Sequence, residues 1–85
     1  MKVEKIQALR INFLKGLYTS CNADPEEDMD MFELGEQLGI SFDDILKIVS
    51  YLHQDRLISY RGIGPMIGIS HAGIKKAEGT IDQSE

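Results

Sequence analysis

The segment from Asp30 to Gln54 constrains the fold most, because two helix signals follow each other within a few residues. Gly39 can adopt the left-handed conformation that ends a helix, and Ser41 with Asp44 gives the start signal of the next helix. So short a connection predicts two packed helices with a tight turn between them. Gly35 is then the small residue that lets the two helices approach closely.

Both helices of this pair have the apolar spacing of amphipathic helices. Asp30 can cap the first helix, and its inner face is expected to consist of Met31, Leu34 and Leu38. The inner face of the second helix is expected to consist of four residues: Ile45, Ile48, Val49 and Leu52.

A longer amphipathic helix is predicted from Val3 to Tyr18, with a wide apolar face. One stripe, which suits a core contact, consists of Ile6, Leu9, Phe13 and Leu17. A second group widens the apolar arc to roughly 200°, about twice what a single core contact needs. Because an apolar stripe left in water would be unusual, we expect a homodimer built on this second group, which consists of Val3, Ile11, Leu14 and Tyr18.

The C-terminal part of the chain predicts a β-hairpin and a last helix. The strand-like runs "LISYR" (57–61) and "MIGIS" (66–70) are joined by "GIGP", in which glycine and proline favour a turn. Ser70 can cap the last helix, which we expect to end near Glu78. Residues 80–85 are then expected to form a disordered tail.

The order of these elements resembles the winged helix-turn-helix domain of bacterial and archaeal transcription regulators. The resemblance rests on the spacing of the two helices and on the run "YLHQDRLISYRGIGPMIGISHAGIKKAE", and it covers about residues 3–78. It implies one α+β domain over residues 1–79, mainly α with a small β-hairpin. The implied order is helix, short strand, helix, helix, strand, strand, helix, with the short strand at Met29. The family commonly has a glycine where this chain has Arg56, so Asp55 or Arg56 is expected to take a strained φ.

The resemblance implies that the chain binds double-stranded DNA as a transcription regulator. In this family the third helix reads the major groove and the hairpin, or wing, contacts the backbone or the minor groove. Side chains of suitable chemistry lie on the predicted outer face of the helix and at the wing. The candidate DNA-binding residues are Lys47, Ser50, Tyr51, Gln54 and Arg61.

The charge distribution leaves a second function open. Residues 29–60 carry six acidic and two basic side chains, which is −4 of the net charge of −5. Asp43 and Asp44 can stabilise the helix through its dipole, but they also stand where phosphate would approach. The alternative is a winged helix that does not bind DNA, whose first helix and acidic third helix contact a basic protein partner.

Enzymatic and metal-dependent functions are not expected. His53, His71 and Cys21 lack metal-ligand spacing, and we expect no cofactor. A single cysteine excludes an internal disulfide. The N-terminal "MKVEKIQALR" has no apolar core of a signal peptide, and no apolar run reaches the roughly 18 residues of a membrane span, so we expect a cytoplasmic protein without a membrane partner.

Overall fold

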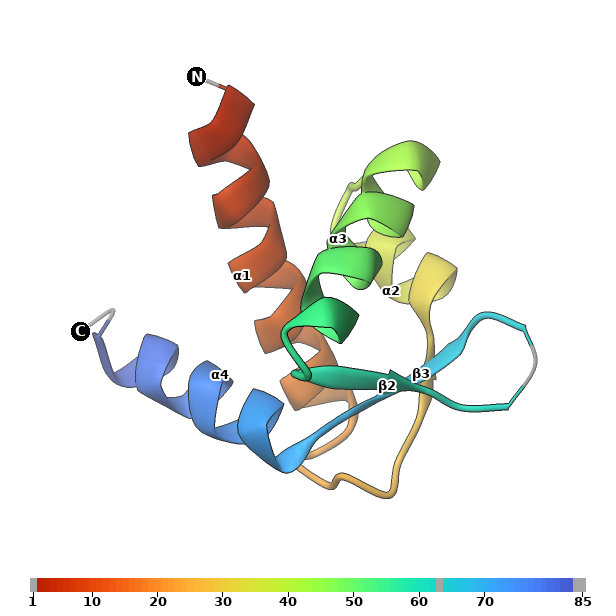
Figure 1. Cartoon of the computed structure of the whole chain (residues 1–85), viewed down its shortest axis with the longest axis vertical. Helices are drawn as coiled ribbons and strands as arrows, with labels where there is room; N and C mark the ends of the chain where they lie inside the picture. The colour runs from red at the N-terminus through yellow and green to blue at the C-terminus, as the bar shows by residue number, and fades with distance from the viewer. Residues whose placement is uncertain (1, 63, 84–85) are drawn as a thin grey trace.

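The computed structural model describes the backbone of residues 2–62 and 64–83 and the side chains of residues 7–62 and 64–79. The fold is mixed α+β, with four helices and a three-stranded antiparallel sheet (Figure 1). The elements are α1 (Lys2–Ser20), β1 (Met29–Asp30), α2 (Met31–Gln37), α3 (Phe42–Gln54), β2 (Ile58–Tyr60), β3 (Met66–Ile69) and α4 (His71–Gln83).

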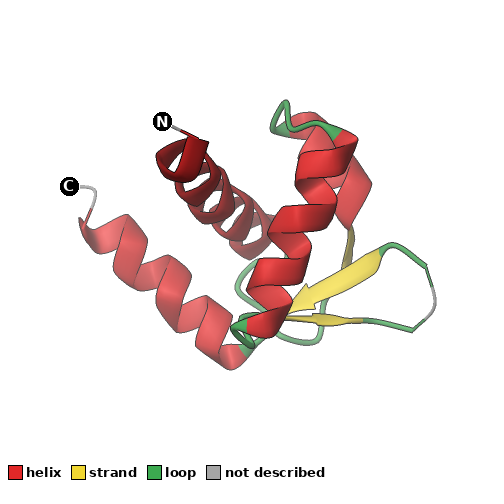
Figure 2. Ribbon diagram, turned by 45° about the horizontal axis from the view of Figure 1, so that its top comes forward, coloured by secondary structure: helices red, strands yellow, loops and turns green. Residues whose placement is uncertain are grey.

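The predicted order of elements is confirmed, including the short strand at Met29. The strand order in the sheet is β1-β3-β2, so β3 is central, and Met29 pairs with Ile67 while Ile58 pairs with Ile69. Figure 2 shows the strands projecting to one side, away from α1 and α4. The loop between β2 and β3 therefore extends from the body of the molecule.

The core lies where α1, α2, α3 and β3 meet. The four residues predicted for the inner face of α3 are all buried, which confirms that prediction. In α2, Met31 and Leu34 are buried as predicted. Leu38, directly after the helix, is 39% exposed, but its methyl groups lie against Gly16 of α1, so it belongs to the inner face only in part. The largest fully buried side chains are Phe13, Leu17, Cys21, Leu34, Ile48, Val49, Ile67 and Ile69.

The second apolar group of α1 packs mainly within the same chain. Leu14 is only 4% exposed and belongs to the core, and Tyr18 is half-buried, with its hydroxyl donating a hydrogen bond to Glu78 Oε2 of α4 at 3.0 Å. The expectation that these two residues need a second subunit is therefore wrong, because α4 packs against α1. Ile11 remains 40% exposed, and the side chain of Val3 lies outside the described residues. The homodimer itself stays a prediction.

The last helix is longer than the sequence indicated. α4 continues to Gln83, so residues 80–83 are helical and the expectation of a disordered tail is wrong for them. Gly79, directly after the predicted end, lies inside the helix without a positive φ. No proline follows, and Ile74, Ala77 and Ile81 keep helical spacing through this region. Residues 84 and 85 lie outside the described residues.

Local signals at the helix ends act as predicted. The side chains of Asp30 and Ser41 cap α2 and α3, and Gly39 has a φ of 73° in the turn between them. Arg56 has a φ of 63°, which confirms the strained position expected after α3. Ser70 Oγ accepts a hydrogen bond from the amide of Gly73 at 3.0 Å, and thereby caps α4.

Candidate functional site

The outer face of α3 carries three of the side chains that the sequence predicted for DNA contact. Lys47, Ser50 and Gln54 are exposed and follow one another at spacings of three and four residues, so they lie along one line of the helix. This arrangement presents one cation and two hydrogen-bonding groups to solvent. The helix has no other lysine and no arginine.

Tyr51 adjoins this line on the side of α3 that faces α1. Its ring is 46% exposed, and the guanidinium carbon of Arg10, from α1, lies 4.7 Å from the ring centroid. Because the guanidinium lies over the ring, one face of Tyr51 is already in a cation–π contact with a residue of the same chain. Tyr51 therefore takes part in the contact between α1 and α3, although it also adjoins Lys47 and Gln54, from which it is four and three residues away.

Arg61 does not extend from the β2–β3 loop toward the face of α3. Its guanidinium donates a hydrogen bond to the carbonyl of Pro25, in the loop between α1 and β1, and it lies across Gly68 of β3. Its Nε is buried without a hydrogen-bond partner. Ile67 and Ile69 point into the core, so Gly68 and Arg61 lie on the opposite side of the sheet. Arg61 is therefore engaged within the chain, since the missing side chain of Gly68 lets it fold back, and its assignment to DNA contact stays a prediction.

Arg61→Ala is expected to destabilise the fold by about 1.5 to 3 kcal/mol, because it removes a charge-assisted hydrogen bond to Pro25 and uncovers β3. Urea denaturation checks this, with Lys75→Ala as a control because Lys75 is an exposed cation on α4. Equal midpoints for the two variants would contradict the structural role of Arg61.

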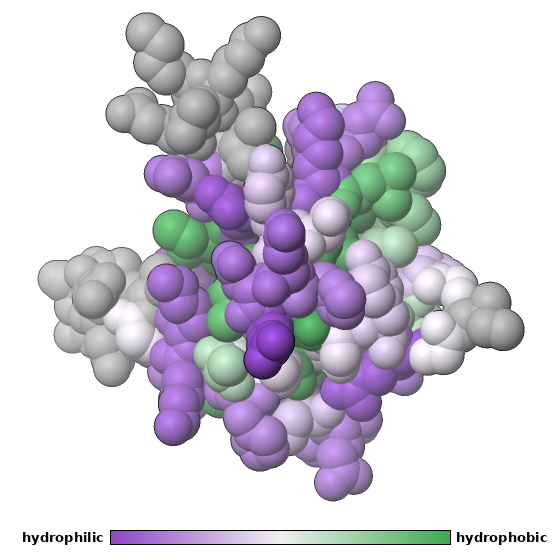
Figure 3. Space-filling view, in the orientation of Figure 1, coloured by the Kyte–Doolittle hydropathy of each residue, from purple (hydrophilic) through white to green (hydrophobic). Residues whose placement is uncertain are grey.

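A stacked aromatic pair, which the sequence patterns did not predict, lies beside the outer face of α3, with Phe32 half-buried and Phe42 exposed. The rings of Phe32 and Phe42 stack with their centroids 4.9 Å apart and their planes at 11°. Phe42 is 61% exposed, and Leu46, one turn further along α3, is 42% exposed. We call Phe32, Phe42 and Leu46 the apolar patch. Figure 3 shows this hydrophobic surface over α2 and α3, at the upper right. The sequence did contain a signal for an exposed apolar surface, since Phe42 and Leu46 fall outside the inner stripe of α3.

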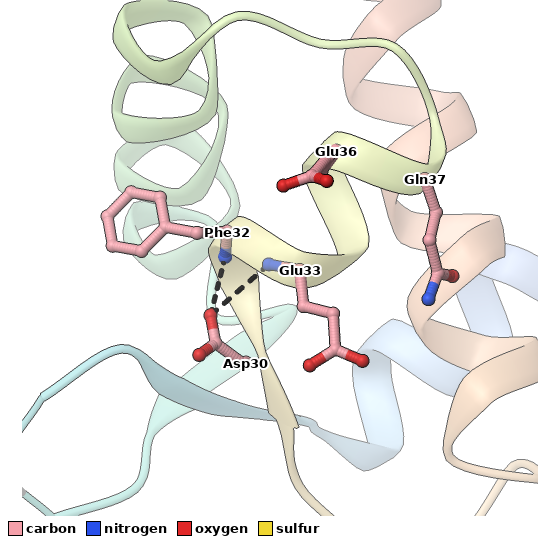
Figure 4. A pocket seen from close by; sticks show the side chains of 5 residues that line it. All are labelled: Asp30, Phe32, Glu33, Glu36 and Gln37. Carbon is pink, nitrogen blue, oxygen red and sulfur yellow. Dashed lines mark hydrogen bonds between the residues drawn. The ribbon is translucent and has the colours of Figure 1, made fainter.

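Carboxylates adjoin the apolar patch. A shallow pocket on α2 is lined by Asp30, Phe32, Glu33, Glu36 and Gln37 (Figure 4). One oxygen of Asp30 is used to cap α2, accepting from the amides of Phe32 at 2.9 Å and Glu33 at 3.2 Å. In Figure 4 the side chains of Phe32 and Glu36 extend toward α3, whereas Gln37 lies on the side of α1.

The charge of this region is strongly unbalanced. Between residues 30 and 54 the chain has one lysine, Lys47, against five carboxylates, namely Asp30, Glu33, Glu36, Asp43 and Asp44. Glu33, Glu36 and Asp43 are exposed, and Asp44 is half-buried. The face formed by α2 and α3 is therefore both acidic and apolar. We refer to it as the α2–α3 face, defined by the apolar patch with Glu33, Glu36 and Asp43.

The histidines and the cysteine do not come together. His53 contacts the ring of Tyr60, with centroids 4.6 Å apart, and His71 is exposed at the start of α4. Cys21 is buried, and this burial raises the pKa of its thiol above the ordinary value of 9.0. In the part of the chain that the structure describes, no group of three or more histidine, cysteine, aspartate or glutamate side chains has a metal-binding arrangement.

Comparisons with known proteins identify no relative. No family model matches the chain, and no significant match is found among the curated proteins or the solved structures. Within residues 2–62 and 64–83, none of the helices combines the length and the hydropathy needed to cross a membrane. Functional inference therefore depends on the chemistry of the α2–α3 face.

Proposed function

We propose that the chain is a winged helix-turn-helix domain that binds a protein partner through the α2–α3 face and does not use this face for duplex DNA. The order of elements and the three-stranded antiparallel sheet support the winged-helix assignment. Because one fold can serve many functions, the function is inferred from the surface and not from the fold.

The observation that carries the proposal is the exposed ring of Phe42 next to carboxylates, on the helix that would enter the major groove. Duplex DNA carries one negative charge per roughly 1.7 Å of its axis, and proteins bind it mainly by neutralising phosphates with lysine and arginine. Asp43 lies one turn before Lys47, so it offsets the one cation of α3. Arg61 is held at Pro25 on another part of the molecule. Protein interfaces, in contrast, are enriched in exposed aromatic side chains.

Fluorescence anisotropy with random duplex DNA tests the proposal. We expect no binding by the wild-type chain even at low salt, where electrostatic attraction to phosphate would be strongest. Anisotropy that rises with protein concentration at low salt, falls as salt is added and is reduced in Lys47→Ala would contradict the proposal.

Duplex DNA remains the second candidate, because Lys47, Ser50 and Gln54 are aligned on the outer face of α3. Lys47 suits phosphate or guanine, and Gln54 suits adenine. With so few cations, such binding would show a shallow dependence on salt and an affinity near the weak end of the roughly 10⁻⁴ to 10⁻⁶ M range for non-specific complexes.

A further inference from the structure

We infer that the partner of the α2–α3 face is a cationic amphipathic segment of a protein, which places an arginine on the ring of Phe42 and an apolar side chain on Leu46. The inference rests on the proposed function, since it names the chemistry of the protein that this face binds. Its observations are the exposure of the apolar patch, the carboxylates on the same two helices and the geometry of α3.

The exposure of Phe42 has no structural explanation within the chain. The ring lies at the first residue of α3, where it stacks on Phe32 and leaves 61% of the residue in contact with solvent. Phe32 is half-buried and packs against the core, so it holds the pair in place. The cap of α3 comes from Ser41, whose Oγ accepts from the amide of Asp44 at 3.3 Å, and does not need the ring. An aromatic side chain fixed in this way is a ready surface for a partner.

The carboxylates select a cationic partner. Glu33 and Glu36 are exposed on α2, Asp43 follows Phe42 directly, and α2 contains no basic residue. Neighbouring negative charges raise the affinity for a cation that approaches the ring and repel an acidic segment. Arginine fits best, because its planar guanidinium can stack on an aromatic face while its N–H groups donate to carboxylates.

The spacing of the apolar patch defines the shape of the partner. Phe42 and Leu46 are one turn apart on the same side of α3, and the ring of Phe32 continues the patch onto α2. A partner that covers all three must offer apolar and basic side chains at short intervals along one face. An amphipathic helix that presents leucine and arginine a turn apart satisfies this geometry.

The experiment uses the full chain and two synthetic amphipathic peptides. One peptide carries leucine and arginine at helical spacing, and the second has glutamate in place of every arginine. Isotope-labelled protein is titrated with each peptide, and amide shifts are followed by NMR. With the arginine peptide we expect the largest shifts in α2 and at the start of α3, whereas the glutamate peptide should cause none.

Matched variants separate recognition at this face from general attraction to an acidic protein. Phe42→Ala, and Glu33→Gln with Glu36→Gln, should each weaken binding of the arginine peptide about tenfold. The control, Glu26→Gln with Glu27→Gln, removes the same charge from exposed residues of the α1–β1 loop and should leave the affinity unchanged.

The possible outcomes distinguish this inference from the proposed function. Three results would overturn the choice of a cationic partner. They are absence of binding, equal binding of both peptides, and an equal loss of affinity in the control and in the face variants. Binding confined to the arginine peptide and lost in the face variants would support it. If duplex DNA binds the wild-type chain and competes with the peptide, the proposed function fails as well.

Discussion

Gly73→Ala is expected to lower the free energy of unfolding by about 3 kcal/mol, because there is no space for a methyl group at this position. A Cβ at Gly73 would overlap the backbone carbonyl of Leu57 and contact the side chain of Ile69. The carbonyl cannot move easily, since it also accepts a hydrogen bond from the amide of Ser70 at 3.0 Å. The hydroxyl of Ser70 donates to the carbonyl of Arg56 at 2.7 Å, which fixes the same junction between α3, β3 and α4.

Urea denaturation measures this loss, with Gly79→Ala as the control on the same helix. No atom lies within 4 Å of the position that a Cβ at Gly79 would take, and the residue is exposed. Alanine there should stabilise α4 by up to about 1 kcal/mol through helix propensity alone. Two variants of equal stability would show that the close approach at Gly73 does not hold the fold together.

Gly35→Leu is expected to unfold the protein or to destabilise it by about 3 kcal/mol, since α2 and α3 meet at this glycine. A Cβ at Gly35 would already overlap the side chain of Ile45. Because the atoms that it meets belong to a side chain and not to the backbone, Gly35→Ala should cost less than Gly35→Leu, about 1 to 2 kcal/mol. Thermal melts of both variants test the contact.

A double-mutant cycle tests whether Ile45 is the group that limits space at Gly35. Ile45→Ala alone leaves a cavity and should cost about 2 to 5 kcal/mol. Combined with Gly35→Ala, the new methyl group occupies part of that cavity, so the double variant should be more stable than the sum of the single effects by about 1 kcal/mol. Strict additivity, or equal tolerance of leucine and alanine at Gly35, would contradict the packing of α2 on α3.

The order of elements could be predicted because each boundary has a local signal. Ser41 and Ser70 cap the helices that follow them, Gly39 supplies the left-handed turn, and the apolar spacing of α3 gives its inner face. Even the strained φ of Arg56 followed from the absence of glycine at that position. Each of these features depends on a few residues that are neighbours in the chain, so it can be predicted from the sequence alone.

The features that were not predicted depend on contacts between distant residues. A helical wheel indicated that α1 needs a second partner, but it could not show that α4 of the same chain covers this face. The direction of Arg61 is set by Gly68 and by the carbonyl of Pro25, which is far away in the sequence. The stack of Phe32 on Phe42 likewise joins two helices. Spacing within one element contains no information about such pairs.

The most direct test of the function of the α2–α3 face is to reverse the charge of Asp43 and Asp44 and to measure DNA binding. Loss of the two carboxylates from the first turn should cost about 0.3 to 1 kcal/mol each, so the variant should remain folded, as circular dichroism can verify. At low salt we expect no change in the anisotropy of labelled duplex DNA with the wild type. Binding that weakens with salt should appear with Asp43→Lys combined with Asp44→Lys. Salt-sensitive binding by the wild type, reduced in Lys47→Ala, would contradict the assignment of this face to a protein partner.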